Sequence, residues 1–461
     1  MKKNKKSVAS LYIFGLLLLV LAFFRSYKIA GILSALVLFT FWIYFAYLNI
    51  RLVLKYVYIF IAMGAYATGN LMCEYIPVYL VELGTDSKYV GSFSLLALLY
   101  WISSISLRHI DSVVERKINK RKRYNYKSSA ISLTKVLKKL SLSVVFVIGF
   151  VYWLIVFRKP SFLLEINRFG YASLMPNWLY KIRTIPILFS PIVYLAVMDN
   201  GKGNRSKKMR KIIITFLPFT LFSFWIGNKY GIFINLLVAF LIPLAGRIDY
   251  SRIRFKAILH TGLCVVCALT FILIMYWHLR GNNFLQIGVK FTTRLSQQGE
   301  LWWAVVDKQD WLGSHFTDID QELTSVARSF ITSGREKTYG VYRLMNIYGN
   351  HSYLKRYYDV DMRLSAQGFE LYFYYLGIFA YVLFPLITNF IYALITNLYA
   401  NAVHTRSLSA IVYLRMLIVI QTALAQGDWY RLTSSLDLML IMFLLYDIVL
   451  RRYYRIRKEN V

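Results

Sequence analysis

Four basic side chains stand next to hydrophobic segments, where they could bind an anionic phosphate group. Arg280 and Arg294 lie in a long polar stretch, Lys229 stands in a short turn between two glycines, and Arg168 belongs to the run Asn-Arg-Phe-Gly-Tyr at 167–171. A guanidinium group binds phosphate oxygens in a bidentate manner, and an ammonium group acts as a point charge. The alternative for each residue is an anchoring contact with lipid headgroups.

The same polar stretch contains the candidates for a proton-transfer group. They are Glu300, Asp318, Asp320, Glu322, His278, His315 and His351. A general base must come within hydrogen-bond reach of the hydroxyl that it deprotonates, and no spacing selects one of these residues. The three acids at 318–322 are oxygen ligands of the kind that Mg²⁺ binds, with a solvated loop as the alternative. No Walker loop, dinucleotide-binding turn, HExxH or nucleophile elbow occurs, so ATP-driven transport and soluble-type hydrolysis lose their usual support. No cofactor and no metal site is predicted.

The composition indicates the class of protein that must position these residues. Hydrophobic residues are 58% of the 461 residues and aromatic residues 17%, far from the balance of a soluble domain. We therefore expect an all-α integral membrane protein with about twelve transmembrane helices, since a helix needs roughly 20 apolar residues to cross a bilayer. The expected spans are 10–24, 29–50, 56–82, 89–106, 140–157, 184–198, 212–227, 231–245, 257–276, 369–399, 408–425 and 433–450.

The distribution of the 55 Lys and Arg residues predicts the orientation of these spans. Basic residues concentrate in alternate short loops and at both termini, which places these parts in the cytoplasm. Residues 277–368 then form one large extracytoplasmic loop between membrane domains at 1–276 and 369–461. The net charge of +33 follows from the basic cytoplasmic flanks, which anionic lipids attract, so it does not predict nucleic-acid binding.

The 277–368 loop contains two segments of helical periodicity. One runs from Ile287 to Lys308 and the other from Tyr339 to Tyr348. A loop of this length at a membrane face is uncommon unless it covers a site. At 100° per residue, one face of the first segment carries Arg294, Gln297, Gln298, Leu301 and Trp302.

Two runs in this loop are similar to a known family. Arg-Leu-Ser-Gln-Gln-Gly-Glu-Leu-Trp-Trp at 294–303 resembles the Arg-x-x-x-Gln-Gly stretch of bacterial Wzy-type oligosaccharide repeat-unit polymerases, which make O-antigen and capsular polysaccharides. Tyr-Gly-Val-Tyr-Arg-Leu-Met-Asn at 339–346 resembles their Gly-x-x-x-Leu-Met stretch. The dozen spans, the cytoplasmic ends and the dominant exterior loop also match this family. Its Arg-x10-Gly pattern does not occur at Arg168, Arg294 or Arg328.

The resemblance implies a glycosyltransferase of the bacterial cytoplasmic membrane. At the outer face it would move the growing glycan from polyprenyl diphosphate onto the next lipid-linked unit. Cations would stabilise the diphosphate leaving group, and Glu300 or His315 would accept the proton of the acceptor hydroxyl. The substrate-binding residues implied are Arg168, Lys229, Arg280, Arg294, Gln298 and Arg343. The implied partners are the lipid-linked oligosaccharide, the bilayer and a chain-length regulator.

Other readings of the same features remain open. Trp302, Trp303 and Trp311 would stack on sugar faces, or else belong to an interfacial aromatic belt. A polysaccharide ligase would share nearly all of these sequence features. A flippase or transporter for lipid-linked oligosaccharide would also have about twelve spans, but it tends to show internal repeats and short loops.

Overall fold

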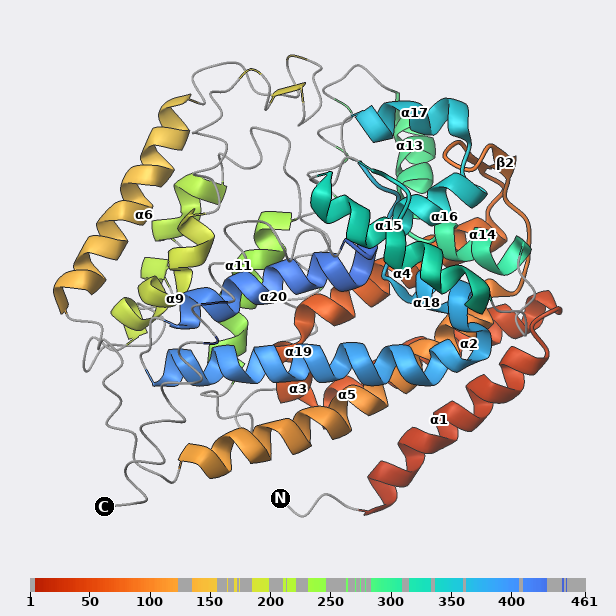
Figure 1. Cartoon of the computed structure of the whole chain (residues 1–461). Helices are drawn as coiled ribbons and strands as arrows, with labels where there is room; N and C mark the ends of the chain where they lie inside the picture. Colours follow the sequence, from red (N-terminus) through yellow and green to blue (C-terminus); the bar gives the residue numbers. More distant parts are fainter. Residues whose placement is uncertain are drawn as a thin grey trace.

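The computed structural model (Figure 1) describes residues 5–122, 135–155, 185–198, 210–212, 214–220, 231–245, 283–308, 315–332, 336–359, 362–405 and 409–428, with single residues between these ranges. Within this part the regular secondary structure is helical apart from one two-stranded ribbon. In that ribbon β1 (Tyr79–Leu80) pairs antiparallel with β2 (Thr85–Asp86). The predicted all-α fold class is therefore confirmed.

The described part of the chain contains the helices of a bundle and a group of short helices, α13 to α18, at one end of it. In chain order they are α1 (Lys5–Phe23), α2 (Lys28–Leu48), α3 (Ile50–Lys55), α4 (Val57–Tyr75), α5 (Ser92–Lys122), α6 (Lys135–Ile155), α9 (Ile185–Met198), α11 (Gly231–Ala245), α13 (Phe284–Ser296), α14 (Glu300–Lys308), α15 (Ile319–Ile331), α16 (Val341–Tyr348), α17 (His351–Asp359), α18 (Phe369–Leu376), α19 (Ala380–His404) and α20 (Ser409–Gln426), with the 3-10 turns η2 (Phe316–Asp318) and η3 (Gly377–Phe379).

Four stretches of the described chain are long and apolar enough to cross a membrane. They are Lys28–Leu48, Ser92–Ile118, Phe369–His404 and Ser409–Gln426, which is compatible with membrane insertion. The expected number of about twelve is not reached in this part of the chain.

The predicted span 56–82 is shorter than expected. α4 ends at Tyr75, and Ile76 is extended, with φ −112° and ψ 124°. The next residue is Pro77, which disfavours a helical conformation in the residue before it and has no N–H for the helix. The chain then forms the β1–β2 ribbon, so Glu82 lies in a turn outside the helix instead of at the end of a span.

α5 and α19 run side by side through the bundle (Figure 1) and are joined by buried polar contacts. Asn389 Nδ2 donates to the Ser103 carbonyl at 2.9 Å, and Asn397 Nδ2 donates to Asp111 Oδ1 at 2.7 Å. Lys55 Nζ lies 2.7 Å from the same oxygen of Asp111. Removing one member of a buried ion pair is strongly destabilising. The Lys55–Asp111 pair therefore holds α3 against α5, and the bond from Asn397 to Asp111 holds α19 at the same place.

The outer surface of α19 is apolar along one stripe. Val382, Leu386 and Phe390 follow one another at four-residue spacing and are 57%, 47% and 51% exposed. Residues at this spacing share one face of a helix. A continuous apolar face on a 25-residue helix suits contact with lipid tails.

Several loops meet at the end of the bundle where α13 to α17 gather (Figure 1). Tyr75 Oη donates to the Lys28 carbonyl at 2.7 Å, and Tyr89 Oη donates to the Arg25 carbonyl at 2.6 Å. Gly340 packs against the backbone at Gln426 and Gly427. The loops after α1, α4 and α20 thus lie together with described residues of the 277–368 segment.

Candidate functional site

A close crossing of two backbone segments places the first turn of α14 against α4. The single helix expected between Ile287 and Lys308 is interrupted, because residues 297–299 form a turn between α13 and α14. A Cβ atom on Gly299 would lie 2.2 Å from the backbone nitrogen of Asn70, and one on Gly69 would lie 2.4 Å from the Leu295 carbonyl oxygen. Only glycine permits so close an approach. Glu300, the next residue, consequently enters the protein interior.

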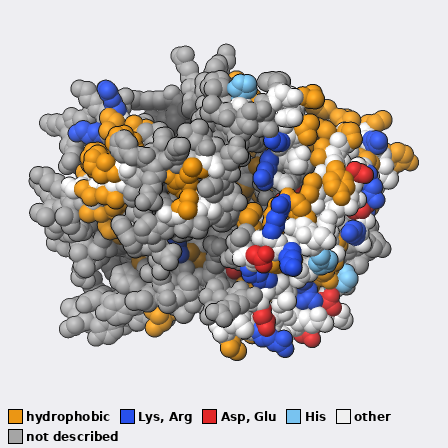
Figure 2. All heavy atoms as spheres, turned by 90° about the horizontal axis from the view of Figure 1, so that it is seen from above, with side chains coloured by type: hydrophobic (Ala, Val, Ile, Leu, Met, Phe, Trp, Pro, Cys, Tyr) orange, Lys and Arg blue, Asp and Glu red, His pale blue; other side chains and the backbone are white. Residues whose placement is uncertain are grey.

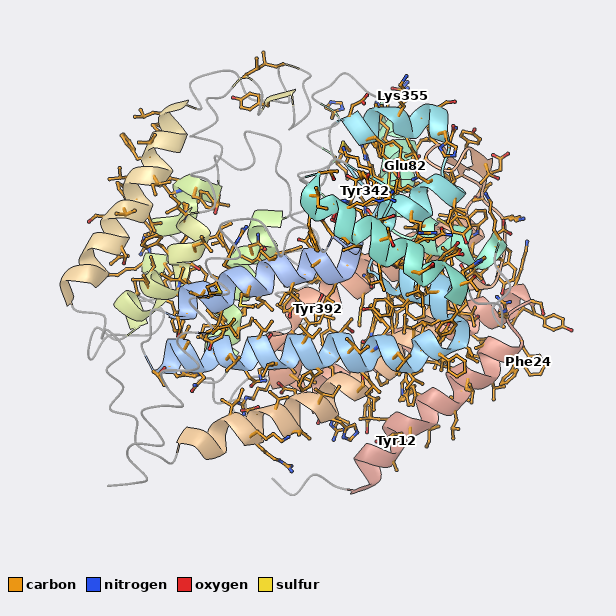
Figure 3. All side chains as sticks on the ribbon, viewed as in Figure 1. Tyr12, Phe24, Glu82, Tyr342, Lys355 and Tyr392 are labelled. Carbon is orange, nitrogen blue, oxygen red and sulfur yellow. The ribbon has the colours of Figure 1, made fainter. Side chains whose placement is uncertain are left out.

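Glu82 reaches the same region from the turn between β1 and β2. Its backbone carbonyl accepts a hydrogen bond from Asn350 N at 2.9 Å, and Gly84, with φ +70°, allows the turn to close beside Asn350. The residue is 4% exposed. Figure 3 shows Glu82 near α13 and α17, at one end of the bundle.

A chain of hydrogen bonds links Glu82 to the surface. Gln297 Nε2 donates to Glu82 Oε1 at 2.9 Å, and Arg294 Nη1 donates to Gln297 Oε1 at 3.0 Å. Tyr357 Oη also donates to Glu82 Oε1. The amide of Gln297 has one orientation that serves both neighbours, because its NH₂ must face the carboxylate and its oxygen must face the guanidinium. Glu82 therefore orients Gln297, which in turn positions the exposed side chain of Arg294.

Glu300 is the most deeply buried acid of this group, at 1% exposure. Neither of its carboxyl oxygens has a hydrogen-bond partner among the residues that the structure describes. Burial raises the pKa of Glu300 well above its ordinary value, the neighbouring Glu82 carboxyl raises it further, and Arg294 opposes the shift. Glu300 consequently holds a proton more readily than an exposed glutamate does.

This arrangement combines two chemical capabilities. The exposed guanidinium of Arg294 can bind an anionic group, and the carboxyl pair beside it can exchange a proton. An acid whose pKa is perturbed by burial and by a charged neighbour is typical of a functional site. Figure 2 shows further Lys and Arg side chains on the described part of the face seen from above, interspersed with acidic and apolar ones.

His315 and Arg343 lie in a second cluster, formed by α15, α16 and α18. The imidazole of His315 stacks on Tyr374 at 4.3 Å, and its Nδ1 is 3.7 Å from Asp318 Oδ2. Arg343 Nη1 lies 3.9 Å from Glu322 Oε2. Burial raises the pKa of Glu322. Of the two residues expected to transfer the proton, Glu300 therefore belongs with Arg294, whereas His315 contacts other residues.

The remaining predicted residues have different outcomes. Gln298 lies half-buried in the turn beside Gly69. Arg168, Lys229 and Arg280 lie outside the described residues. In the described part of the chain, no group of three or more His, Cys, Asp or Glu side chains is arranged to hold a metal ion.

The role expected of the tryptophans is wrong for two of them. Trp302 and Trp303 are 0% and 1% exposed, so neither ring is available to stack on a sugar. Their indole N–H groups donate to the carbonyls of Ser92 at 2.9 Å and Lys88 at 2.8 Å. Trp302 thus attaches α14 to the first residue of α5, and Trp303 attaches it to the loop that precedes α5. Trp311 lies outside the described residues.

Sequence reasoning missed Glu82 and Tyr357. Glu82 was assigned to the end of a span, although Pro77 and Gly84 flank it closely and are typical of a turn. Tyr357 lies 275 residues from Glu82, and no local pattern relates the two positions.

Comparison with known proteins gives one partial match. The model of a family of unknown function, DUF6418, matches residues 334–441. This part includes α16 to α20 and Arg343, but neither Arg294 nor the Glu82–Glu300 pair. No curated protein and no solved structure matches the chain.

Proposed function

We propose that the protein is a glycosyltransferase of the bacterial cytoplasmic membrane that joins oligosaccharide units carried on polyprenyl diphosphate, as a repeat-unit polymerase does. The observation that carries this proposal is the exposed guanidinium of Arg294, held by Gln297 and Glu82 beside the buried Glu300. A multi-pass topology with cytoplasmic termini and an exterior 277–368 loop is part of the same proposal.

Arg294 would bind the diphosphate of the donor. Its guanidinium is exposed at the end of α13, and the bond to Gln297 fixes it in place before substrate arrives. A cation that is already oriented stabilises the charge developing on a leaving group without reorganisation at the moment of reaction. The site therefore favours a substrate with an anionic leaving group at a membrane surface.

The Glu82–Glu300 pair would accept the proton that the reaction releases. The hydroxyl oxygen of the acceptor sugar attacks the anomeric carbon of the donor, the bond from that carbon to the diphosphate oxygen breaks, and the diphosphate leaves with the electron pair. The hydroxyl proton passes to the carboxyl pair. Because burial raises the pKa of Glu300, its carboxylate is a stronger base than an exposed one.

The test uses purified protein in proteoliposomes supplied with polyprenyl-diphosphate-linked oligosaccharide, with the products separated by chain length. We expect a ladder of elongated glycans, and a loss of about 100-fold or more for Arg294→Ala, the scale for removing one charge-stabilising group. Arg328→Ala is the matched control, since Arg328 is an exposed arginine on α15. A normal rate for Arg294→Ala would remove Arg294 from the site. Transbilayer movement without elongation would identify a transporter, and a single transfer to an unrelated acceptor would identify a ligase.

A further inference from the structure

A cavity lies between α4, α5, α14, α18 and α19. The cavity has room for a water molecule. The apolar part of the wall is formed by Met63, Leu96, Leu99, Trp302, Phe369 and Phe384. Polar side chains converge on the same space from Tyr66, Tyr100, Ser103, Gln367 and Glu370.

Two of the polar side chains leave an atom without a hydrogen-bond partner among the described residues. They are Glu370 through Oε1 and Tyr66 through Oη, and the residues are 1% and 4% exposed. Tyr100 differs, because its Oη donates to Gln367 Oε1 at 2.8 Å. Buried polar groups are nearly always hydrogen-bonded. Two unpartnered groups on one cavity therefore indicate a small ligand that can donate and accept hydrogen bonds.

The charge balance indicates what that ligand carries. None of the ion pairs in the described part of the chain includes Glu370, and its second oxygen accepts a long bond of 3.3 Å from Gln367 N. The start of α18 favours a negative charge there, but this effect is smaller than the cost of burying an unpaired carboxylate. A metal cation would need several oxygen ligands, whereas most of the wall is apolar. A proton on Glu370 removes the unpaired negative charge and needs no further oxygen ligands from the apolar wall.

We propose that this cavity is a proton-binding site, in which Glu370 keeps a proton and donates a hydrogen bond to a water molecule that also binds the Tyr66 hydroxyl. The site is separate from the Glu82–Glu300 pair. Trp302 lines the cavity, and at 100° per residue it projects from the opposite side of α14 to Glu300. The inference thus goes beyond the proposed glycosyl transfer and does not depend on it.

Infrared spectroscopy of the purified full-length protein tests the proposal without substrate. The carbonyl stretch of protonated carboxyl groups is recorded before and after exchange into D₂O, in sodium-free buffer. We expect Glu370→Gln to lose one band that shifts on exchange, and Tyr66→Phe to keep that band at a higher frequency because a hydrogen-bond partner of the bound water is gone. Glu300→Gln is the matched control and should leave this band in place.

Two outcomes would overturn the proposal. If Glu370→Gln retains every band of the unaltered protein, Glu370 is ionised and the cavity holds no proton. If the band of the unaltered protein disappears when sodium is added, the ligand is a metal cation. Should Glu370→Gln fail to fold, the frequency of the band in Tyr66→Phe still decides, since an unchanged frequency contradicts the shared water. None of these results bears on glycan elongation.

Discussion

Gln297 provides a quantitative test of how the candidate site is held together. Gln297→Ala removes the bonds of 2.9 Å to Glu82 and 3.0 Å to Arg294. A hydrogen bond to a charged group contributes about 1.5–3 kcal/mol. Arg294 is exposed and water replaces part of the loss, so we take the lower end, about 1.5 kcal/mol for the change as a whole. Because each 1.36 kcal/mol changes a rate about tenfold, we expect transfer to slow by roughly tenfold.

The assay measures initial rates of glycan elongation in proteoliposomes for the unaltered protein, Gln297→Ala and Gln286→Ala. Gln286 is an exposed glutamine on the same helix, α13. Its backbone N–H donates to the capping side chain of Asn283, and its own side chain serves as the control. Equal rates for the two variants would refute the positioning role of Gln297. A loss as large as that of Arg294→Ala would also refute it, since Gln297 would then contact substrate itself.

Two further predictions concern stability. Gly299→Ala should lower Tm, because the added methyl group would lie 2.2 Å from Asn70 N. The control Gly288→Ala, with nothing within 4 Å of the new atom, should raise Tm or leave it unchanged. Equal Tm values for the two variants would contradict the close crossing of α4 and the turn before α14. The raised pKa of Glu300 means that the folded unaltered protein binds more protons than the unfolded chain, so its stability falls as pH increases. Glu300→Gln lacks this titrating group, so it should gain stability relative to the unaltered protein as pH rises from about 5 to about 8. Tm measured across this range checks it, and a difference independent of pH would contradict a protonated Glu300.

The sequence predicts features of this protein that depend on neighbouring residues. The helical pattern at 339–348 corresponds to α16, and apolar segments such as 29–50 and 408–425 correspond to α2 and α20. The break at 297–299 could not be predicted, because it depends on contact with Gly69, more than two hundred residues earlier. A glycine inside a helical pattern is compatible with either a continuous or an interrupted helix.

The composition of the site was predictable only in part. Arg294 and Glu300 were selected because a guanidinium and a carboxylate suit phosphate and proton chemistry, and the structure brings them together. Their connection runs through Glu82, whose position depends on the turn after Pro77 and on Asn350 N. Trp302 and Trp303 have the amphipathic character of interfacial residues. Their burial follows from bonds to Ser92 and Lys88, which no local pattern reveals.

The affinity of the purified protein for polyprenyl diphosphate tests the central claim most directly. We expect the unaltered protein to bind the diphosphate more tightly than the monophosphate, because the proposed function has the Arg294 guanidinium bind the more highly charged diphosphate. Arg294→Ala should lose about tenfold or more in diphosphate affinity, on the scale of one charge-assisted bond, while Arg328→Ala should bind as the unaltered protein does. Equal diphosphate affinities for all three proteins would contradict the account.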